Sequence, residues 1–303
     1  MYLQHFGFRE YPFSLTPDTS FFYGYASHQE ALNVLLVALR SGEGFIKVTG
    51  EVGLGKTLLY RKLLDSLGDG FVTAFLPNPH LSPGSMRLAL AEELGAGVSN
   101  RATQEDMLRA ITRRLLQLAG AGTQVVVCLD EVQAMPNYTL EAVRLLTNLE
   151  TEKFKLLQVV MFGQPELDAR LKGIHLRQLQ QRITFSYRLV PLDKQAVAEY
   201  VRHRLRVAGY HGAPLFTERA LAAVYRGSGG IPRLVNILCH KALLAAFGPG
   251  EDYITLRHVR RAVADTEGAR RLTPRFLHPL IYAAVIGAVG LVAGMMYWLE
   301  TWR

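Results

Sequence analysis

The sequence predicts an α/β protein: a three-layer domain around a parallel sheet, followed by a smaller helical domain and a C-terminal transmembrane helix. Three observations support this prediction. A glycine-rich loop at residues 50–57 lies between an apolar run and a helical pattern. Short apolar runs alternate with helical patterns as far as residue 190, which is typical of βαβ units. Only helical patterns follow, and residues 280–299 carry no charge.

The loop at residues 50–57 fits the phosphate-binding pattern G-x-x-x-x-G-K-[ST]. Its glycines let backbone N–H groups turn toward phosphate oxygens, Lys56 brings a positive charge to the β- and γ-phosphates, and Thr57 offers a hydroxyl to Mg²⁺. An apolar run at 45–48 precedes the loop and a helical pattern at 58–67 follows it, so a helix N-terminus should face the phosphates. The residues expected to bind the nucleotide are Gly50, Glu51, Val52, Gly53, Leu54, Gly55, Lys56, Thr57 and Leu58.

After the loop, strands and helices alternate. Ser82 opens a helix that ends at Gly95. Thr103 with Asp106 forms a capping pair for the next helix. The run at 125–129 is apolar and β-branched enough for a central strand of a parallel sheet. The remaining elements expected in this part are strands at 71–76 and 156–162, a strand beginning near Thr184, and a helix at 140–149.

The pattern changes after Pro191, where apolar residues recur only at helical spacing. The helices expected there include 197–205, one opened by Thr217, 231–247 and 256–264. The predicted division is an α/β core at 1–190, a helical lid domain at 191–267, a basic linker at 268–278, a transmembrane helix at 279–299 and a tail at 300–303.

Two adjacent carboxylates, Asp130 and Glu131, directly follow the run at 125–129. The carboxyl ends of parallel strands meet at one edge of a sheet, so both side chains should lie near the phosphates. We expect Asp130 to hold the Mg²⁺ shell and Glu131 to orient or polarise the attacking water. The alternative is an Asp-Glu pair that only opens a surface turn.

Phosphoryl transfer also requires cations or dipoles near the γ-phosphate. Gln164 follows a predicted buried strand and is expected to contact the γ-phosphate or the water. Arg233 begins a helix of the second domain and is expected to reach the nucleotide from there. Arg177 and Arg182 lie on one helix, and one of them is expected to act as an arginine finger toward a neighbouring subunit. A polar loop position is the alternative for Gln164, and a solvated helix face is the alternative for Arg177 and Arg182.

The length and composition of the chain limit the number of domains, the state of its cysteines and the compartment in which its N-terminal part lies. A chain of 303 residues with 49% hydrophobic and 20% charged residues can bury a sizeable core and suggests about two domains. Cys128 and Cys239 have no partner at metal-ligand spacing, which favours reduced thiols in a cytosol. Residues 1–10 lack the basic and apolar regions of a signal peptide, so we expect the N-terminal part to remain cytoplasmic.

The uncharged stretch at 280–299 has the length that a helix needs to cross about 30 Å of hydrocarbon. Arginines precede it at 257, 260, 261, 270, 271 and 275. Only Arg303 follows it, so we expect a single-pass anchor in the inner membrane with the large N-terminal part inside. The arginines contribute to the net charge of +8 and favour contact with membrane lipid over nucleic acid. A buried core helix, and a solvated face for 257–261, are the alternatives.

Several motifs occur in the order seen in one family. They are the segments 6–18 and 42–45, the phosphate loop, and the segments 129–131, 162–167 and 230–236. Over residues 1–267 the chain resembles the ExeA/GspA-type AAA+ secretion ATPases, and among them the members that serve type IV pili of the mannose-sensitive haemagglutinin (MSHA) type. Ordered motifs of this kind are far more specific than a phosphate loop alone.

The resemblance implies a P-loop NTPase fold of the AAA+ type that binds ATP and Mg²⁺. It implies Walker A and Walker B roles for the phosphate loop and the Asp-Glu pair, a sensor 1 role for Gln164 and a sensor 2 role for Arg233. Arg182 is the preferred finger. Asn78 is similar in position to the AAA+ residue that restrains the catalytic glutamate, and residues 12–13 would lie near the adenine.

The resemblance also implies a homo-oligomer whose partners are inner-membrane pilus or secretion assembly proteins. Family members that continue into a periplasmic peptidoglycan-binding domain are not matched beyond Arg303, so direct wall binding is not expected. The leading hypothesis is a membrane-anchored ATPase that supports MSHA-like pilus biogenesis or assembly of type II-like secretion machinery. A DNA-associated AAA+ ATPase of the transposition-regulator kind, and a nucleotide-gated scaffold with negligible turnover, are the alternatives.

Overall fold

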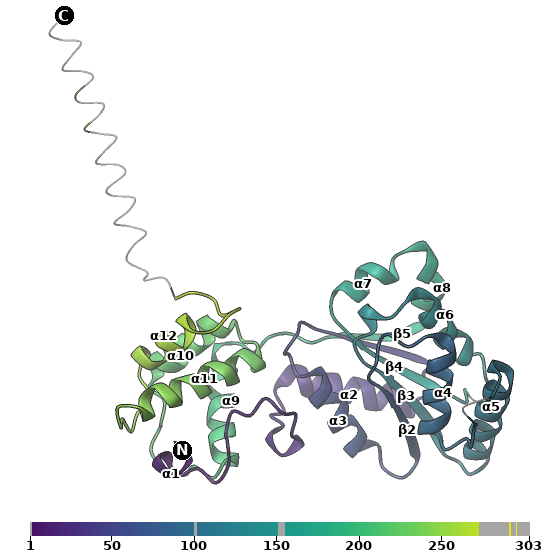
Figure 1. The fold of residues 1–303 in the computed structure, drawn as a ribbon, viewed down its shortest axis with the longest axis horizontal. Helices are drawn as coiled ribbons and strands as arrows, with labels where there is room; N and C mark the ends of the chain where they lie inside the picture. The colour runs from purple at the N-terminus through teal and green to yellow at the C-terminus, as the bar shows by residue number, and fades with distance from the viewer. Residues whose placement is uncertain (1, 100–101, 151–154, 273–290, 292–294, 296–303) are drawn as a thin grey trace, which may run out of the picture.

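The computed structural model describes residues 2–99, 102–150, 155–272, 291 and 295. An α/β domain and a helical domain lie side by side, and the N-terminus lies on the helical domain (Figure 1). The α/β fold predicted from the sequence is confirmed.

Among the described residues, five strands form one parallel sheet in the order β2-β3-β4-β1-β5. They are β1 (Phe45–Thr49), β2 (Phe71–Leu76), β3 (Gln124–Leu129), β4 (Gln158–Gly163) and β5 (Ile183–Arg188). Neighbouring strands are closely in register, since Phe45 of β1 is paired with Val159 of β4 and Thr49 with Gly163. The carboxyl ends of these strands therefore lie at one edge of the sheet, where the phosphate loop leaves β1.

Side chains of β3 alternate between the two faces of the sheet. Val125, Val127 and Leu129 belong to one apolar core, and Val126 and Cys128 belong to another. Helices on the first face are α4 (Pro83–Glu93), α5 (Gln104–Gly120), α6 (Asn137–Leu146), α7 (Glu166–Leu171) and α8 (Arg177–Arg182). Helices on the second face are α2 (Ala26–Arg40) and α3 (Lys56–Leu67). Each fully buried aliphatic side chain of these cores contributes about 1.5–3 kcal/mol of hydrophobic stabilisation.

Helix ends follow the capping residues seen in the sequence. The Ser82 hydroxyl accepts a hydrogen bond from the Ser85 amide at the start of α4. Thr103 and Asp106 form a reciprocal capping box at the start of α5. Gly68 ends α3 with φ of 72°, a left-handed value that glycine adopts without strain. The capping chemistry therefore predicts these boundaries correctly.

The helical domain has one core to which the N-terminal residues contribute. Its helices are α9 (Lys194–Val207), α10 (Glu218–Ser228), α11 (Pro232–Phe247) and α12 (Leu256–Ala264), joined by α1 (Tyr2–Phe6). Among the buried aromatic residues of this core are Tyr2, Phe6, Phe8, Phe13 and Phe21. The predicted division placed residues 1–190 together, whereas residues 2–21 pack mainly against the helical domain because these aromatic side chains find their apolar surface there.

The segment between α1 and α2, residues 7–25, is here called the strap. It contains a short 3₁₀ turn, η1 (Thr19–Phe21), and runs from the helical domain to the α/β domain. The Arg9 amide donates to the Ala208 carbonyl at the end of α9, which fixes the strap to the helical domain at its start.

No helix among the described residues is long and apolar enough to cross a membrane. Apart from residues 291 and 295, the predicted transmembrane helix at 279–299 lies outside the described residues. The tail at 300–303 and residues 273–278 of the predicted linker also lie outside them.

Candidate active site

The phosphate loop curls between β1 and α3 as its sequence predicts. Gly53 and Gly55 have φ of 84° and 90°, left-handed values that a residue with a Cβ adopts only with strain. A Cβ on Gly53 would also lie 2.7 Å from the Cβ of Arg233, which is closer than packed carbon atoms approach. These glycines therefore permit both the curl of the loop and the close approach of the helical domain.

Lys56 is buried within the loop, with 6% of its surface exposed. Its ammonium group donates to the carbonyl oxygens of Gly50 at 2.7 Å and Glu51 at 3.2 Å. Burial lowers the pKa of Lys56, while the charges of Glu131 and Asp130 act in the opposite direction. The positive charge thus sits between the loop and the predicted Walker B carboxylates, where a phosphate group could replace the carbonyl partners.

A buried histidine supports the loop from α2. The Nε2 atom of His28 lies 2.7 Å from the Leu54 carbonyl oxygen, so it is the nitrogen that carries the proton and donates. Only 7% of His28 is exposed, and burial lowers its pKa, which keeps the ring neutral. The sequence analysis missed this residue because its partner is a backbone carbonyl that no local pattern reveals.

Asp130 and Thr57 come together as predicted for a Mg²⁺ site. Burial raises the pKa of Asp130, while hydrogen bonds from the Glu131 amide and the Thr57 hydroxyl lower it. Carboxylate and hydroxyl oxygens are the ligands that Mg²⁺ accepts alongside substrate phosphates and water. No group of three or more His, Cys, Asp and Glu side chains in the described part of the chain could hold a metal without such phosphates. The residues present fit a Mg²⁺ ion that arrives with its nucleotide.

Glu131 adopts an unusual backbone conformation. With φ of 50° it has the single left-handed non-glycine backbone among the described residues, and such strain is often found at functional sites. Its Oε2 atom accepts hydrogen bonds from the side-chain amides of Gln133 at 2.5 Å and Gln164 at 3.0 Å. Burial raises the pKa of Glu131, but these two hydrogen bonds and the charge of Lys56 outweigh it, so the pKa is lowered. The carboxylate is therefore ionised at neutral pH.

The structure brings the side chain of Gln164, directly after β4, to Glu131. Its expected contact with the γ-phosphate or the attacking water stays a prediction. Gln133 was missed by the sequence analysis, although it lies only two residues after Glu131. Asn78 does not reach this carboxylate, because its side chain is exposed after β2 and its Oδ1 atom accepts from the His80 amide at 2.9 Å. The structure therefore shows no hydrogen bond between Asn78 and Glu131, and the expected restraint stays a prediction.

Arg233 reaches the loop from the first turn of α11. Its amide donates to the Gly53 carbonyl at 3.2 Å. In the part of the chain that the structure describes, its exposed guanidinium has no hydrogen bond or ion pair and lines the same cavity as Lys56 and Glu131. A free cation at this position is suited to a γ-phosphate, as the predicted sensor 2 role requires.

A cavity of about 320 Å³ extends from the loop between the two domains. Its wall opposite the loop is formed by strap residues 14–18, together with Tyr200, Arg204 and Asn236 of the helical domain. Phe13 does not line it, since its ring is 2% exposed and packs edge-on against Phe216. Residues 12–13 were expected to lie near the adenine, whereas the part of the strap that lines the cavity begins one residue later, at Ser14.

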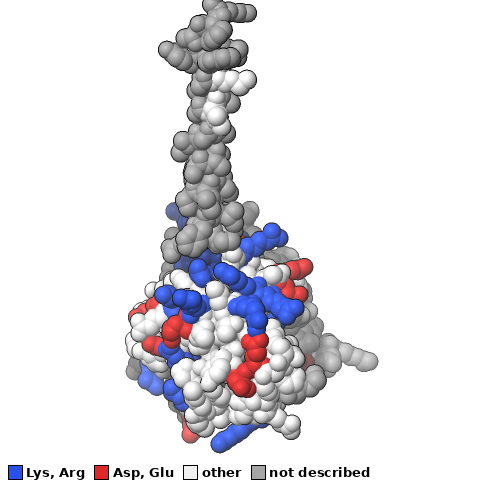
Figure 2. Space-filling model, turned by 90° about the vertical axis from the view of Figure 1, so that its left-hand side faces the viewer, with Lys and Arg blue, Asp and Glu red and all other residues white. Residues whose placement is uncertain are grey.

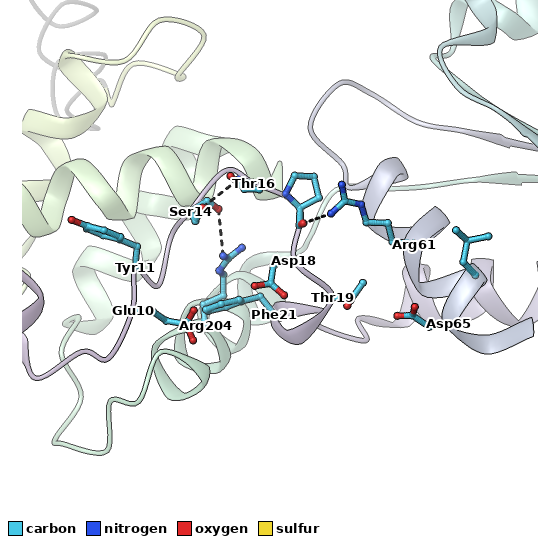
Figure 3. A pocket seen from close by; sticks show the side chains of 12 residues that line it. Glu10, Tyr11, Ser14, Thr16, Asp18, Thr19, Phe21, Arg61, Asp65 and Arg204 are labelled. Atoms are coloured by element: carbon cyan, nitrogen blue, oxygen red, sulfur yellow. Dashed lines mark hydrogen bonds between the residues drawn. The ribbon is translucent and has the colours of Figure 1, made fainter. Parts of the chain in front are cut away.

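Arg204 ties the strap to α9. This arginine is 5% exposed and covers the Phe21 ring at 4.5 Å. Its guanidinium donates to the Pro12 carbonyl oxygen at 2.5 Å. It also donates to the Ser14 carbonyl oxygen at 3.4 Å (Figure 3). On the other side, Arg61 of α3 donates to the Pro17 carbonyl at 2.5 Å. The strap is therefore held by one arginine from each domain, beside a second cavity of about 550 Å³.

The predicted finger lies far from this protomer's own loop. Arg182 directly precedes β5, whose first residue, Ile183, is paired with Phe45 at the start of β1. It is therefore at the opposite edge of the sheet from the loop. Its guanidinium donates to the Thr147 hydroxyl at 3.0 Å and to the Arg144 carbonyl at 3.3 Å, whereas Arg177 is exposed. Neither arginine can serve its own site, so a finger role would require a second subunit.

Residues 39–171 match the family model described as an AAA domain. The fold is similar to that of the ORC2 protein of Aeropyrum pernix in its ADPNP-ADP complexes, with a TM-score of 0.62, 17% identity and coverage of 85% of this chain and 73% of that chain. It is also similar to Cdc6p from Pyrobaculum aerophilum, with a TM-score of 0.64, 18% identity and coverage of 82% and 70%. The sheet order, the loop and this AAA domain define a P-loop enzyme of the AAA+ class that hydrolyses ATP.

Among curated proteins, the chain is similar to General secretion pathway protein A of Aeromonas hydrophila. The two are 44% identical over 270 residues, which is 89% of this chain and 49% of that protein. The chain thus spans about half the length of this relative.

Proposed function

We propose that this ATPase acts at the inner membrane in the assembly of a secretion system or a type IV pilus. The observation that carries the proposal is the 44% identity to General secretion pathway protein A, over a segment that contains the whole candidate site. In this proposal ATP binds to residues 50–58, with Mg²⁺ between Thr57 and Asp130. Glu131 polarises the attacking water, and Gln164 and Arg233 stabilise the transferred phosphoryl group.

Assembly of an MSHA-type pilus is the more specific form of the proposal. It is supported by the order of the sequence motifs at 6–18, 129–131, 162–167 and 230–236. Cross-linking in native membranes, followed by identification of the neighbouring proteins, tests it. Pilus or secretion proteins of the inner membrane are the expected neighbours, and the recovery of DNA-bound proteins alone would contradict the proposal.

Charged side chains on the helical domain support an approach to anionic lipid. Figure 2 shows this end of the molecule, where Lys and Arg side chains gather with Asp and Glu among them. Arg257 is paired with Glu251, and Lys241 with Asp265. Several other arginines are exposed and have no ion pair with a described carboxylate: Arg260, Arg261, Arg270 and Arg271. Each could gain about 1 kcal/mol near anionic headgroups.

Removal of residues 279–303 is expected to release the protein from membranes. The sequence at 280–299 carries no charge, so the full chain should sediment with membranes and resist extraction by salt. Fractionation followed by immunoblotting measures this. Removal of residues 300–303 alone is the matched control and should leave the protein in the membrane fraction. A truncated chain that still sediments would show that this segment is not the anchor.

A DNA-associated ATPase is the second candidate function. Binding to DNA would be salt-sensitive, because contacts to phosphates release counterions. The full-length protein in detergent should show no DNA binding at low salt if the assembly role is correct. Salt-sensitive binding in the same assay would favour the DNA role instead.

We further propose that Arg182 completes the site of a neighbouring subunit. Arg182→Ala subunits mixed with Lys56→Ala subunits should recover part of the ATPase rate, since some interfaces then combine an intact loop with an intact finger. The matched control is Arg177→Ala, which should retain its rate without mixing. If no mixture recovers activity above that of the separate variants, Arg182 is not a finger in trans.

A further inference from the structure

We infer that Gln133 is a positioning residue for ATP hydrolysis, which holds the Glu131 carboxylate and the Gln164 side chain in one arrangement. The inference rests on the proposed role of Glu131 in polarising the attacking water. It concerns a residue two positions beyond the Walker B carboxylates, on the short turn η2 (Val132–Ala134).

Gln133 uses both ends of its side-chain amide within the site. Its Nε2 atom donates to Oε2 of Glu131 at 2.5 Å, and its Oε1 atom accepts from the Gln164 backbone amide at 2.9 Å. Gln164 then donates from its own side chain to the same Oε2 atom at 3.0 Å. The three residues therefore form a closed ring of hydrogen bonds between the end of β3 and the end of β4.

This ring assigns different tasks to the two carboxylate oxygens of Glu131. Both amide donors meet Oε2, and no described residue donates to Oε1. Oε1 is therefore the oxygen that can accept a hydrogen bond from a water molecule. With Oε2 fixed at two points, the carboxylate cannot rotate without breaking a bond to Gln133 or Gln164.

Gln133 is itself fixed from α7. The guanidinium of Arg170 donates to the Gln133 carbonyl, and also to the Met135 carbonyl at 2.7 Å and to Asn137 Oδ1 at 2.6 Å. A Cβ on Gly163 would lie 3.3 Å from Gln133 Oε1, so a larger residue there would crowd the ring. The left-handed backbone of Glu131 is strained, and the hydrogen bonds of the ring help to hold the residue in this conformation.

Replacement of Gln133 by methionine tests the inference, because methionine keeps the length of the side chain but removes the donor and acceptor. We expect the steady-state ATPase rate to fall by about 10- to 100-fold, since a misplaced reacting group costs this much. The affinity for a fluorescent ATP analogue should remain within twofold of wild type. In a Glu131→Gln background the same substitution should cause no further loss of rate, because the carboxylate that it positions is already gone.

Gln195→Met is the matched control. Gln195 donates a side-chain hydrogen bond to Glu199 at 2.9 Å on an exposed helix face. The control substitution therefore removes the same type of hydrogen bond, but away from the site. Its rate should equal that of wild type. Gln133→Glu is a second variant, which keeps an acceptor for Gln164 but places a carboxylate against Glu131, and its rate should fall further than that of Gln133→Met.

The outcomes separate this inference from the role on which it rests. If Glu131→Gln keeps the wild-type rate, the role of Glu131 is wrong and the inference falls with it. If Glu131→Gln loses activity while Gln133→Met keeps it, the inference alone is overturned. Three further outcomes would also overturn the inference, because each would make Gln133 a structural residue. They are an equal loss of ATPase rate from Gln133→Met in the wild-type and Glu131→Gln backgrounds, weaker nucleotide binding by Gln133→Met, and unfolding of both Gln133 variants.

Discussion

Glu131→Gln will lower the steady-state rate of ATP hydrolysis by about 10²- to 10⁴-fold, the contribution expected of a general base. Glutamine keeps the size of the side chain but loses the negative charge that polarises water. Its amide oxygen can still accept from Gln133 and Gln164 in the place of Oε2, which leaves its NH2 group, a donor, in the place of the free Oε1. Phosphate release at saturating ATP measures the effect.

Nucleotide binding by Glu131→Gln should be retained, because the loop and Lys56 are unchanged. Titration with a fluorescent ATP analogue checks this. Glu150→Gln, at a position after α6 with an exposed side chain, is the matched control and should leave the rate unchanged. A rate in Glu131→Gln equal to that of wild type would remove the proposed catalytic role. A wild-type protein that binds ATP but shows no measurable turnover would favour the nucleotide-gated scaffold instead.

Lys56→Ala is expected to weaken ATP binding by about 10- to 100-fold, because it removes one to two charge-assisted hydrogen bonds to phosphate oxygens. Turnover should fall as well, since the same charge acts on the γ-phosphate. The substitution also frees the carbonyls of Gly50 and Glu51 from their Lys56 partner. Isothermal titration with ATP and Mg²⁺ measures the affinity.

Lys194→Ala provides the control for the loss of a lysine. Lys194 is exposed at the start of α9, and its removal should leave the affinity for ATP unchanged. Thermal unfolding of both variants separates a binding defect from a folding defect. Unchanged affinity in a folded Lys56→Ala protein would contradict the assignment of residues 50–57 as the nucleotide site.

Local patterns predicted most of the sheet and many helix boundaries. The strand at Phe71–Leu76 and the helix at Leu256–Ala264 have the expected bounds, because turn and capping residues mark their ends. The fourth strand begins at Gln158, two residues later than expected, since Leu156 and Leu157 are buried but outside the ladder. Helix α2 and the packing of the strap were not predicted. Phe8 and Phe13 of the strap pack against Tyr210 and Phe216, which follow 202 and 203 positions later in the chain, and no local periodicity encodes such a contact.

The residues of the candidate site also fall into those that local sequence patterns predict and those that they do not. Lys56, Asp130 and Glu131 belong to motifs whose spacing carries the chemistry, so their meeting at one sheet edge could be predicted. His28 and Arg204 act on the backbone carbonyls of Leu54, Pro12 and Ser14, and none of these three partners has a sequence signature. Their contributions depend on the folded arrangement alone. The roles of Arg182 and Arg233 as finger and sensor stay predictions.

The strap has a mechanical consequence. The chain passes between the two domains twice among the described residues, once along the strap and once after Leu189, whose amide is bonded to Thr49 at the end of β1. Two tethers at separate points permit rotation about the line that joins them and oppose sliding or twisting. The α/β domain and the helical domain should therefore open and close along a single arc. The Arg233 amide of the helical domain donates to the Gly53 carbonyl of the phosphate loop in the α/β domain. Phosphates bound in the loop would therefore determine the angle between the two domains.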